Sequence, residues 1–166
     1  MKQAGFFFGF FLALSTAAIA ENATVNADVE QEIRTLVAAP RVTIVHLWAP
    51  WCSNCNTEMH ADGWAKFVNE NPNVKIVFLN IWHKGQAGAP KLRAAGLGAQ
   101  ANFIALTHPN ASNSRGEQLE QFLGMPVSWV PTTWVYRDGK LRYTLNYGEV
   151  RFEMLQQMVN DAAAAW

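Results

Sequence analysis

The residues that could perform redox chemistry in this chain are its two cysteines, Cys52 and Cys55, within the segment HLWAPWCSNCNTEMH at residues 46–60. A dithiol with this spacing can close a disulfide, bind a metal, attach a haem or remain as inert buried thiols. Haem attachment requires a histidine directly after the second cysteine, and Asn56 occupies that position. Inert thiols are not favoured, because the pair lies at a predicted strand-to-helix junction, where side chains face solvent. A redox centre or a metal site remains.

The predicted helix gives the two sulfurs different roles. Cys52 stands at the helix N-terminus, where unpaired backbone N–H groups and the helix dipole stabilise an anion and lower the thiol pKa below its free value of about 8.5. Cys52 is therefore the predicted nucleophile. Cys55 lies almost one helical turn further on, within reach of a mixed disulfide at Cys52, so we predict that it is the resolving thiol.

A metal site is the alternative to a redox centre. A structural zinc site needs four ligands, and the chain has only two cysteines. His60, together with His46 or His83, would have to supply the remaining ligands, but no second close-spaced pair of ligands accompanies the cysteines. We therefore expect no metal and no cofactor, and we keep a copper-binding module as the alternative outside enzymes.

The composition indicates one globular domain without a nucleic-acid partner. The chain has 166 residues, half of them hydrophobic, which fits a single domain with a sizeable core. Its 13 basic and 13 acidic side chains cancel, and no basic run offers the cationic surface that phosphate backbones attract. We expect no nucleic acid among its partners.

The first residues of the chain, MKQAGFFFGFFLALSTAAIA, predict export. They combine a basic start at Lys2, an apolar run over residues 6–14, and a small-residue pattern at 18–20 that is typical of a secretory cleavage site. We therefore expect a signal peptide at 1–20, a mature domain at 21–166 and a periplasmic location, where disulfides persist. A retained anchor is the alternative, although the apolar run is shorter than the roughly 20 residues that span a bilayer.

The apolar periodicity predicts an α/β domain with the cysteines at the end of a central strand. Two β-rich apolar runs at 41–49 and 74–82 flank a helix that begins at the cysteines and is predicted to reach residue 69, an arrangement with parallel strands. Asp138-Gly139 joins two further β-rich runs in a hairpin. The other predicted elements are helices at 27–39, 92–97, 116–124 (C-capped by Gly124) and 152–162, and a strand at 102–108. The predicted fold class is α/β, with a central mixed sheet flanked by helices.

Two motifs resemble landmarks of the thioredoxin superfamily. WAPWCSNC after a strand is similar to the family's W-[AC]-x-W-C-x-x-C, and VSWVPTTWVYRDGKL, about eighty residues downstream, resembles its cis-proline loop and the hairpin after it. The resemblance covers the chain from about residue 42 to the C-terminus and implies a thioredoxin-like fold. It further implies a cis Val130–Pro131 bond facing the cysteines. We expect Trp51, Trp129, Val130, Pro131 and Thr132 to contact the substrate; Trp129 departs from the family, which often has a small residue there, and would narrow the groove.

The segment CSNCNTEM further resembles the exported TlpA/ResA-type thiol–disulfide oxidoreductases, in which x-x-E-M follows the second cysteine. Glu58 lies one turn past Cys55. It is either close enough to influence the protonation of that thiol, or a solvated acid that complements the helix dipole. His46 stands six residues before Cys52, where thioredoxins have a buried acid; it either moves a proton to Cys55 or is a neutral core histidine. The dipeptide Ser53-Asn54 replaces the family's common proline, so the resemblance transfers no redox potential.

The sequence as a whole predicts an exported enzyme, a thiol–disulfide oxidoreductase that reduces protein disulfides through Cys52 and Cys55. The reductive direction follows from the resemblance to the TlpA type and from the lack of the large helical insertion expected of a DsbA-like oxidase. A disulfide oxidase or isomerase is the alternative among enzymes. We expect protein thiols and disulfides as partners, a membrane thiol carrier as the electron donor, and a monomer.

Overall fold

The described part of the chain is built around a five-stranded mixed β-sheet with the strand order β3-β2-β1-β6-β7. The computed structural model describes residues 29–60, 63–146 and 148–164, and the predicted signal peptide at 1–20 lies outside them. The strands are β1 (Thr43–Trp48), β2 (Lys75–Asn80), β3 (Phe103–Thr107), β6 (Thr132–Arg137) and β7 (Lys140–Leu145). β1, β2 and β3 are parallel, whereas β6 runs antiparallel to β1 and to β7. The predicted α/β class with a mixed sheet is confirmed.

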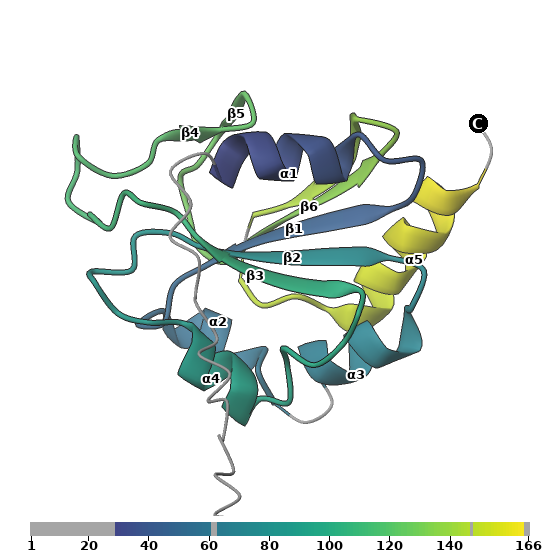
Figure 1. Cartoon of the computed structure of the whole chain (residues 1–166), viewed down its shortest axis with the longest axis horizontal. Helices are drawn as coiled ribbons and strands as arrows, with labels where there is room; N and C mark the ends of the chain where they lie inside the picture. The colour runs from purple at the N-terminus through teal and green to yellow at the C-terminus, as the bar shows by residue number, and fades with distance from the viewer. Residues whose placement is uncertain (1–28, 61–62, 147, 165–166) are drawn as a thin grey trace, which may run out of the picture.

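Helices cover both faces of this sheet (Figure 1). They are α1 (Val29–Val37), α2 (Ser53–Thr57), α3 (Trp64–Glu70), α4 (Ala89–Ala94) and α5 (Phe152–Ala163). The connections from β1 to β2 and from β2 to β3 step in one direction along the sheet, so right-handed crossovers place α2, α3 and α4 on one face. Figure 1 shows these helices together, with α1 on the opposite face. Among the described residues, no helix has the length and apolar character needed to cross a membrane.

The central strand β1 is buried along its whole length because both layers cover it. The Thr43 hydroxyl donates a hydrogen bond to the backbone carbonyl of Leu36 in α1, so Thr43 faces α1, and by alternation Leu47 does too. His46 points to the other face, where its ring centroid lies 4.6 Å from that of Trp64 in α3. The strand therefore packs against α1 with one face and reaches the layer of α2 and α3 with the other.

The helix predicted from the cysteines to residue 69 is two helices, α2 and α3, so its predicted length was wrong. α2 ends at Thr57 with Glu58 as its C-cap, and Gly63 is the N-cap of α3. A Cβ atom at position 63 would lie 2.1 Å from the Glu58 carbonyl oxygen, so the close approach of the two backbones requires glycine. This break turns the Glu58 side chain into the interior.

The helix predicted over residues 116–124 is also wrong. Part of this segment forms β4 (Gln121–Phe122), which pairs with β5 (Met125–Pro126) through a turn at Leu123 and Gly124, whose φ angles are +53° and +77°. Gly124 is therefore a turn residue and not a helix C-cap. The apolar spacing that indicated a helix instead buries Phe122, whose ring stacks on Trp134 at 6.5 Å between centroids. The hairpin predicted at Asp138-Gly139 is confirmed.

Candidate active site

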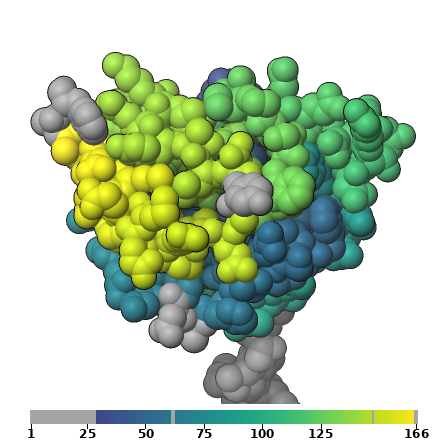
Figure 2. Space-filling view, turned by 180° about the vertical axis from the view of Figure 1, so that it is seen from behind, coloured from purple at the N-terminus to yellow at the C-terminus, as the bar shows by residue number. Residues whose placement is uncertain are grey.

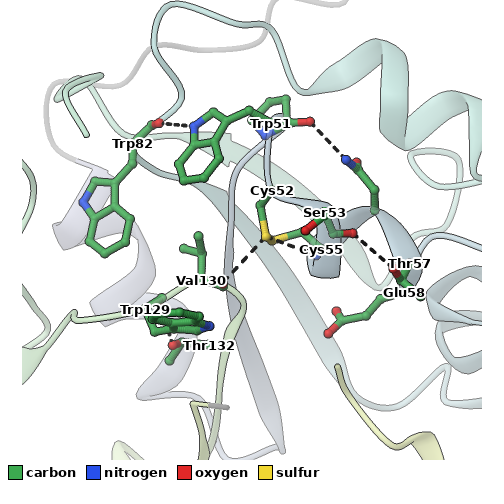
Figure 3. Close-up of a disulfide and its surroundings, with 12 residues drawn as sticks. Trp51, Cys52, Ser53, Cys55, Thr57, Glu58, Trp82, Trp129, Val130 and Thr132 are labelled. Atoms are coloured by element: carbon green, nitrogen blue, oxygen red, sulfur yellow. Dashed lines mark hydrogen bonds between the residues drawn. A yellow bond between two sulfur atoms is a disulfide. The ribbon is translucent and has the colours of Figure 1, made fainter. Parts of the chain in front are cut away.

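Cys52 and Cys55 lie just past the C-terminal end of β1 and form a disulfide (Figure 3). Cys52 is the N-cap of α2, and its Sγ accepts a hydrogen bond from the backbone N–H of Cys55 at 3.1 Å. The turn before the helix is closed by a hydrogen bond from the Cys52 N–H to the Ala49 carbonyl at 3.1 Å. The pair therefore occupies the strand-to-helix junction predicted from the sequence.

Both cysteines are buried, although side chains at this junction were expected to face solvent, and the two differ only in the small area that stays exposed. Cys55 is fully buried, whereas 5 % of Cys52 is exposed. Cys52 Sγ lies 3.6 Å from the carbonyl oxygen of Val130, so the loop before β6 faces the disulfide. An incoming sulfur consequently meets Cys52 before Cys55.

The loop before β6 carries most of the residues predicted to bind substrate. The Val130–Pro131 bond is cis, as the resemblance implies. Trp129 is 52 % exposed, whereas Val130, Pro131 and Thr132 are buried. The Thr132 hydroxyl donates a hydrogen bond to the Trp129 carbonyl at 2.9 Å and closes the loop (Figure 3). The structure brings these residues to the disulfide, and their contact with a substrate stays a prediction.

Trp51 forms a second exposed aromatic surface next to Cys52, with 37 % of its area exposed. Its indole N–H donates a hydrogen bond to the backbone carbonyl of Trp82, in the segment after β2 (Figure 3). The ammonium group of Lys84 lies 4.7 Å from the centre of the Trp51 ring, a distance at which a cation is attracted to the face of an indole. The ring is therefore fixed from one side and open on the other.

Glu58 is buried, so it is not a solvated first-turn acid. The Trp64 indole N–H donates a hydrogen bond to Oε2 at 2.9 Å, and the Val150 backbone N–H donates to Oε1 at 2.7 Å. The pKa of the carboxyl group is raised to about 7: burial is the largest cause, the two hydrogen bonds lower it, and the nearby charge of Glu149 makes a smaller contribution that raises it. A carboxyl group with a pKa near neutrality can both accept and release a proton.

His46 is fully buried on β1 and faces Glu58. Its Nδ1 lies at hydrogen-bond distance, 2.9 Å, from Oγ1 of Thr133 on the neighbouring strand β6. Its Nε2 lies 3.3 Å from Glu58 Oε2 without forming a hydrogen bond. Because burial lowers the pKa of the ring to about 3, the imidazole is neutral at neutral pH. The pair is therefore a neutral ring beside a carboxyl group that titrates.

A pocket of about 270 Å³ lies between the start of β6 and the start of α5. Figure 2 shows this side of the molecule, with α5 in yellow beside β6 and β7 in yellow-green. The pocket is lined by Pro131, Thr133, Leu145, Gly148, Glu149, Val150, Arg151 and Met154. Thr133 contacts His46 and Val150 contacts Glu58, so partners of both buried groups border a space open to solvent.

Sequence reasoning missed the partners that hold the buried pair, namely Trp64, Thr133 and Val150. Thr133 could have been found from strand pairing, because it is the cross-strand neighbour of His46. Trp64 gave only the signal of an inward-facing apolar residue. Val150 donates through its backbone N–H, a group that almost every residue has, so its residue type does not indicate this role.

The structure does not gather the histidines considered as metal ligands. The described residues contain no group of three or more His, Cys, Asp or Glu side chains that could hold a metal ion. His46 is buried on β1, His60 is exposed after α2, and Nε2 of His83 lies 3.1 Å from the backbone carbonyl oxygen of His108. The absence of a metal or cofactor stays a prediction.

Comparisons with known proteins agree with this architecture. StoA from Bacillus subtilis is 22 % identical, with a TM-score of 0.51 over 72 % of this chain and 82 % of that chain. A secreted Mycobacterium tuberculosis disulfide oxidoreductase, described as homologous to E. coli DsbE, is 19 % identical, with a TM-score of 0.51 over 76 % of this chain and 85 % of that chain. A DsbF homologue from Corynebacterium diphtheriae is 17 % identical, with a TM-score of 0.55 over 75 % of this chain and 73 % of that chain. No curated protein sequence matches. A family model described as a thioredoxin-like domain matches residues 29–163, so the chain belongs to the thioredoxin-like domain family.

Proposed function

We propose that this protein is an exported thiol–disulfide oxidoreductase that reduces disulfides in other proteins. One observation carries the proposal: Cys52 caps α2 with its sulfur beside the Val130–Pro131 loop, while Cys55 is fully buried behind it. This arrangement separates an attacking sulfur from a resolving sulfur. It also places the attacking sulfur next to backbone that can pair with an extended segment of a substrate.

In the proposed reaction, the reduced protein transfers two electrons to a substrate disulfide. The Cys52 thiolate attacks one substrate sulfur, the substrate S–S bond breaks, and the leaving sulfur takes up a proton. Cys55 then loses its proton and attacks Cys52 Sγ, which breaks the mixed disulfide. The substrate leaves with both sulfurs reduced, and the protein is left with the Cys52–Cys55 disulfide of the present structure.

Glu58 is the proposed acceptor of the Cys55 proton. It follows Cys55 by one helical turn, and its pKa of about 7 allows it to take a proton from a thiol and return it later. His46 is proposed to position this carboxyl group rather than to carry the proton, because its ring is neutral. Its Nε2 can accept a hydrogen bond from a protonated Glu58 or, in the other tautomer, donate one to the carboxylate, while Thr133 pairs with Nδ1.

The reductive direction and the location are further parts of the proposal. Thioredoxin-fold potentials range from about −270 to −120 mV, and no value in this range is assigned; the resemblance to the TlpA/ResA type supports the direction of the reaction alone. A signal peptide at 1–20 would deliver a mature domain at 21–166 to the periplasm as a monomer. In an oxidising compartment the enzyme must be reduced again, and a membrane thiol carrier is the proposed donor. The secreted oxidoreductase among the structural neighbours supports export.

The decisive experiment uses a Cys55→Ser variant in cells. Without the resolving thiol, Cys52 should remain covalently joined to its substrates, which mass spectrometry would identify. A Cys52→Ser variant is the matched control and should trap none. A purified wild-type protein that reduces no insulin, together with a Cys55→Ser variant that traps no partner, would contradict the proposal. A measured potential near −120 mV would favour an oxidase, and stoichiometric metal retention without insulin reduction would favour the metal-binding alternative.

A further inference from the structure

A lysine from the segment after β2 is bonded to the cysteine segment. The ammonium group of Lys91, in α4, donates hydrogen bonds to the backbone carbonyl of Pro50 at 2.5 Å and to Asn56 Oδ1 at 3.1 Å. The Asn56 side-chain amide also donates to the Pro50 carbonyl, at 3.4 Å. In the sequence, Pro50 precedes Cys52 and Asn56 follows Cys55, so Lys91 joins the start of the redox segment to its end.

The cysteine segment has little positive charge of its own. Residues 47–57, LWAPWCSNCNT, include no charged side chain; the charged or titratable groups beside the segment include Lys91, Lys84 over the Trp51 ring, and Glu58 directly after it. α2 has five residues, so its dipole is weaker than that of the long helix predicted from the sequence. The Val130 carbonyl oxygen, 3.6 Å from Cys52 Sγ, carries partial negative charge and opposes a thiolate there. A cation held beside this segment would therefore have a measurable effect on Cys52.

We propose that Lys91 is a positioning residue of the redox centre, which fixes the turn before Cys52 and supplies a positive charge that stabilises its thiolate. This inference rests on the proposed thiol–disulfide exchange. The two acceptors, one before and one after the cysteines in the sequence, hold the ammonium group in one place, whereas an exposed lysine ordinarily moves freely in solvent. Stabilising the thiolate also stabilises the reduced form, so Lys91 would raise the reduction potential.

The test measures the pKa of Cys52 directly. In the Cys55→Ser background Cys52 is the single thiol, and the ultraviolet absorbance of its thiolate can be followed against pH. Lys91→Gln should raise the pKa of Cys52 by about half a unit to one unit at low salt. The thiolate fraction at neutral pH then falls by about 3- to 10-fold, and higher intrinsic nucleophilicity offsets part of this, leaving a loss of about 2- to 4-fold in the rate of attack.

Four comparisons separate charge from structure. Lys91→Arg should retain the wild-type pKa, and Lys140→Gln, in the hairpin at the other end of the sheet, removes the same charge and should change nothing. The effect of Lys91→Gln should shrink at high salt, because exposed charges are screened. Asn56→Ala, which keeps the lysine but removes one acceptor, should give a smaller change in the same direction.

Two results would overturn this inference. The first is that the pKa of Cys52 in Lys91→Gln equals its pKa in Lys140→Gln. The second is that Lys91→Arg raises the pKa of Cys52 as much as Lys91→Gln does, which would mean that Lys91 has a structural role and no electrostatic one. Both can be read from the single-thiol protein whether or not the wild-type protein reduces insulin. Failure of this inference and failure of the proposed function are therefore distinguishable.

Discussion

The two faces of the central strand β1 both bury apolar side chains, but only the face toward α2 and α3 also buries a titratable group. Toward α1 the strand presents Val45 and Leu47, which together with Ile33 of α1 are fully buried members of the apolar core. Toward α2 and α3 it presents His46, which lies beside the buried carboxyl group of Glu58. One strand therefore contributes to an apolar layer on one side and to a polar, titratable cluster on the other.

The two layers contribute differently to the stability of the fold and to the proposed chemistry. Burying apolar area stabilises the fold by roughly 25 cal/mol per Å², whereas burying a carboxyl group or an imidazole costs free energy that hydrogen bonds offset only in part. The pKa of Glu58, raised to about 7, and the pKa of His46, lowered to about 3, both express that cost. A carboxyl group that is buried at this cost three residues after Cys55 supports the proposed role in proton transfer.

The largest expected effect is on the apolar side. Ile33→Ala removes a fully buried side chain from α1 and should lower the free energy of unfolding by about 2–5 kcal/mol, because a cavity remains. Ile33→Val is the matched control and should cost about 0.5–1.5 kcal/mol. Denaturant unfolding measures both. Insulin reduction per folded molecule should be unchanged, and a large loss of activity would show that the two layers are not separable.

The next effect concerns stability and pH on the polar side. Between pH 4.5 and about 7 the folded protein holds a proton on Glu58 that the unfolded chain has lost, so this group lowers stability as the pH rises. Between about pH 3 and 6.5 the unfolded chain binds a proton on His46 that the folded protein rejects, so this group raises stability as the pH rises. The two contributions oppose each other between pH 4.5 and 6.5.

Glu58→Gln should remove one of these contributions and leave the other. From pH 4.5 to 7 the stability of the variant should rise relative to wild type by on the order of 3 kcal/mol, measured by urea unfolding of the oxidised proteins. Glu70→Gln, an exposed position in α3, is the control and should follow the wild-type curve. Parallel curves for Glu58→Gln and wild type would show that the Glu58 carboxyl group has an ordinary pKa.

A kinetic effect of similar size is expected from the same substitution. Because glutamine cannot accept the Cys55 proton, Glu58→Gln should slow release of the mixed disulfide by about 10²-fold, the low end for loss of a general base. The wild-type rate should depend on pH near 7, and the variant should lose that dependence. Attack by Cys52, followed separately by alkylation of the reduced protein, should change little. An unchanged release rate would assign Glu58 to structure alone.

The elements that position the cysteines were predictable because their signals are local. β1 and β2 are continuous apolar runs, and Asp138-Gly139 has the residue types of a tight hairpin turn. The break at Gly63 was not predictable, because it depends on contact with the carbonyl of Glu58. The segment 116–124 failed for a related reason: its spacing fits a helix, but its tertiary partner, Trp134, selects a hairpin.

The residues of the site also fall into those that a local motif identifies and those whose role depends on tertiary contacts. The motif itself identified Cys52 and Cys55, and the position of Pro131 followed from the resemblance to the thioredoxin superfamily. The environment of Glu58 and His46 depends on residues distant in sequence, above all Thr133 and the backbone of Val150. A pKa is set by burial and by such partners, so the sequence could name these groups but could not fix their protonation.

The smallest expected effect lies outside both layers, at the exposed rim. Trp129 is 52 % exposed and lies in the loop that faces Cys52, so Trp129→Ala should leave stability within about 0.5 kcal/mol of wild type. An aromatic side chain that packs on a substrate segment contributes about 1 kcal/mol, so KM for a protein disulfide should rise by roughly 3- to 10-fold with kcat unchanged. Trp129→Phe should retain most of the affinity, and steady-state kinetics with insulin would measure both variants. If kcat falls instead of KM rising, Trp129 acts on the chemistry behind it, and the rim and the buried cluster form one functional unit.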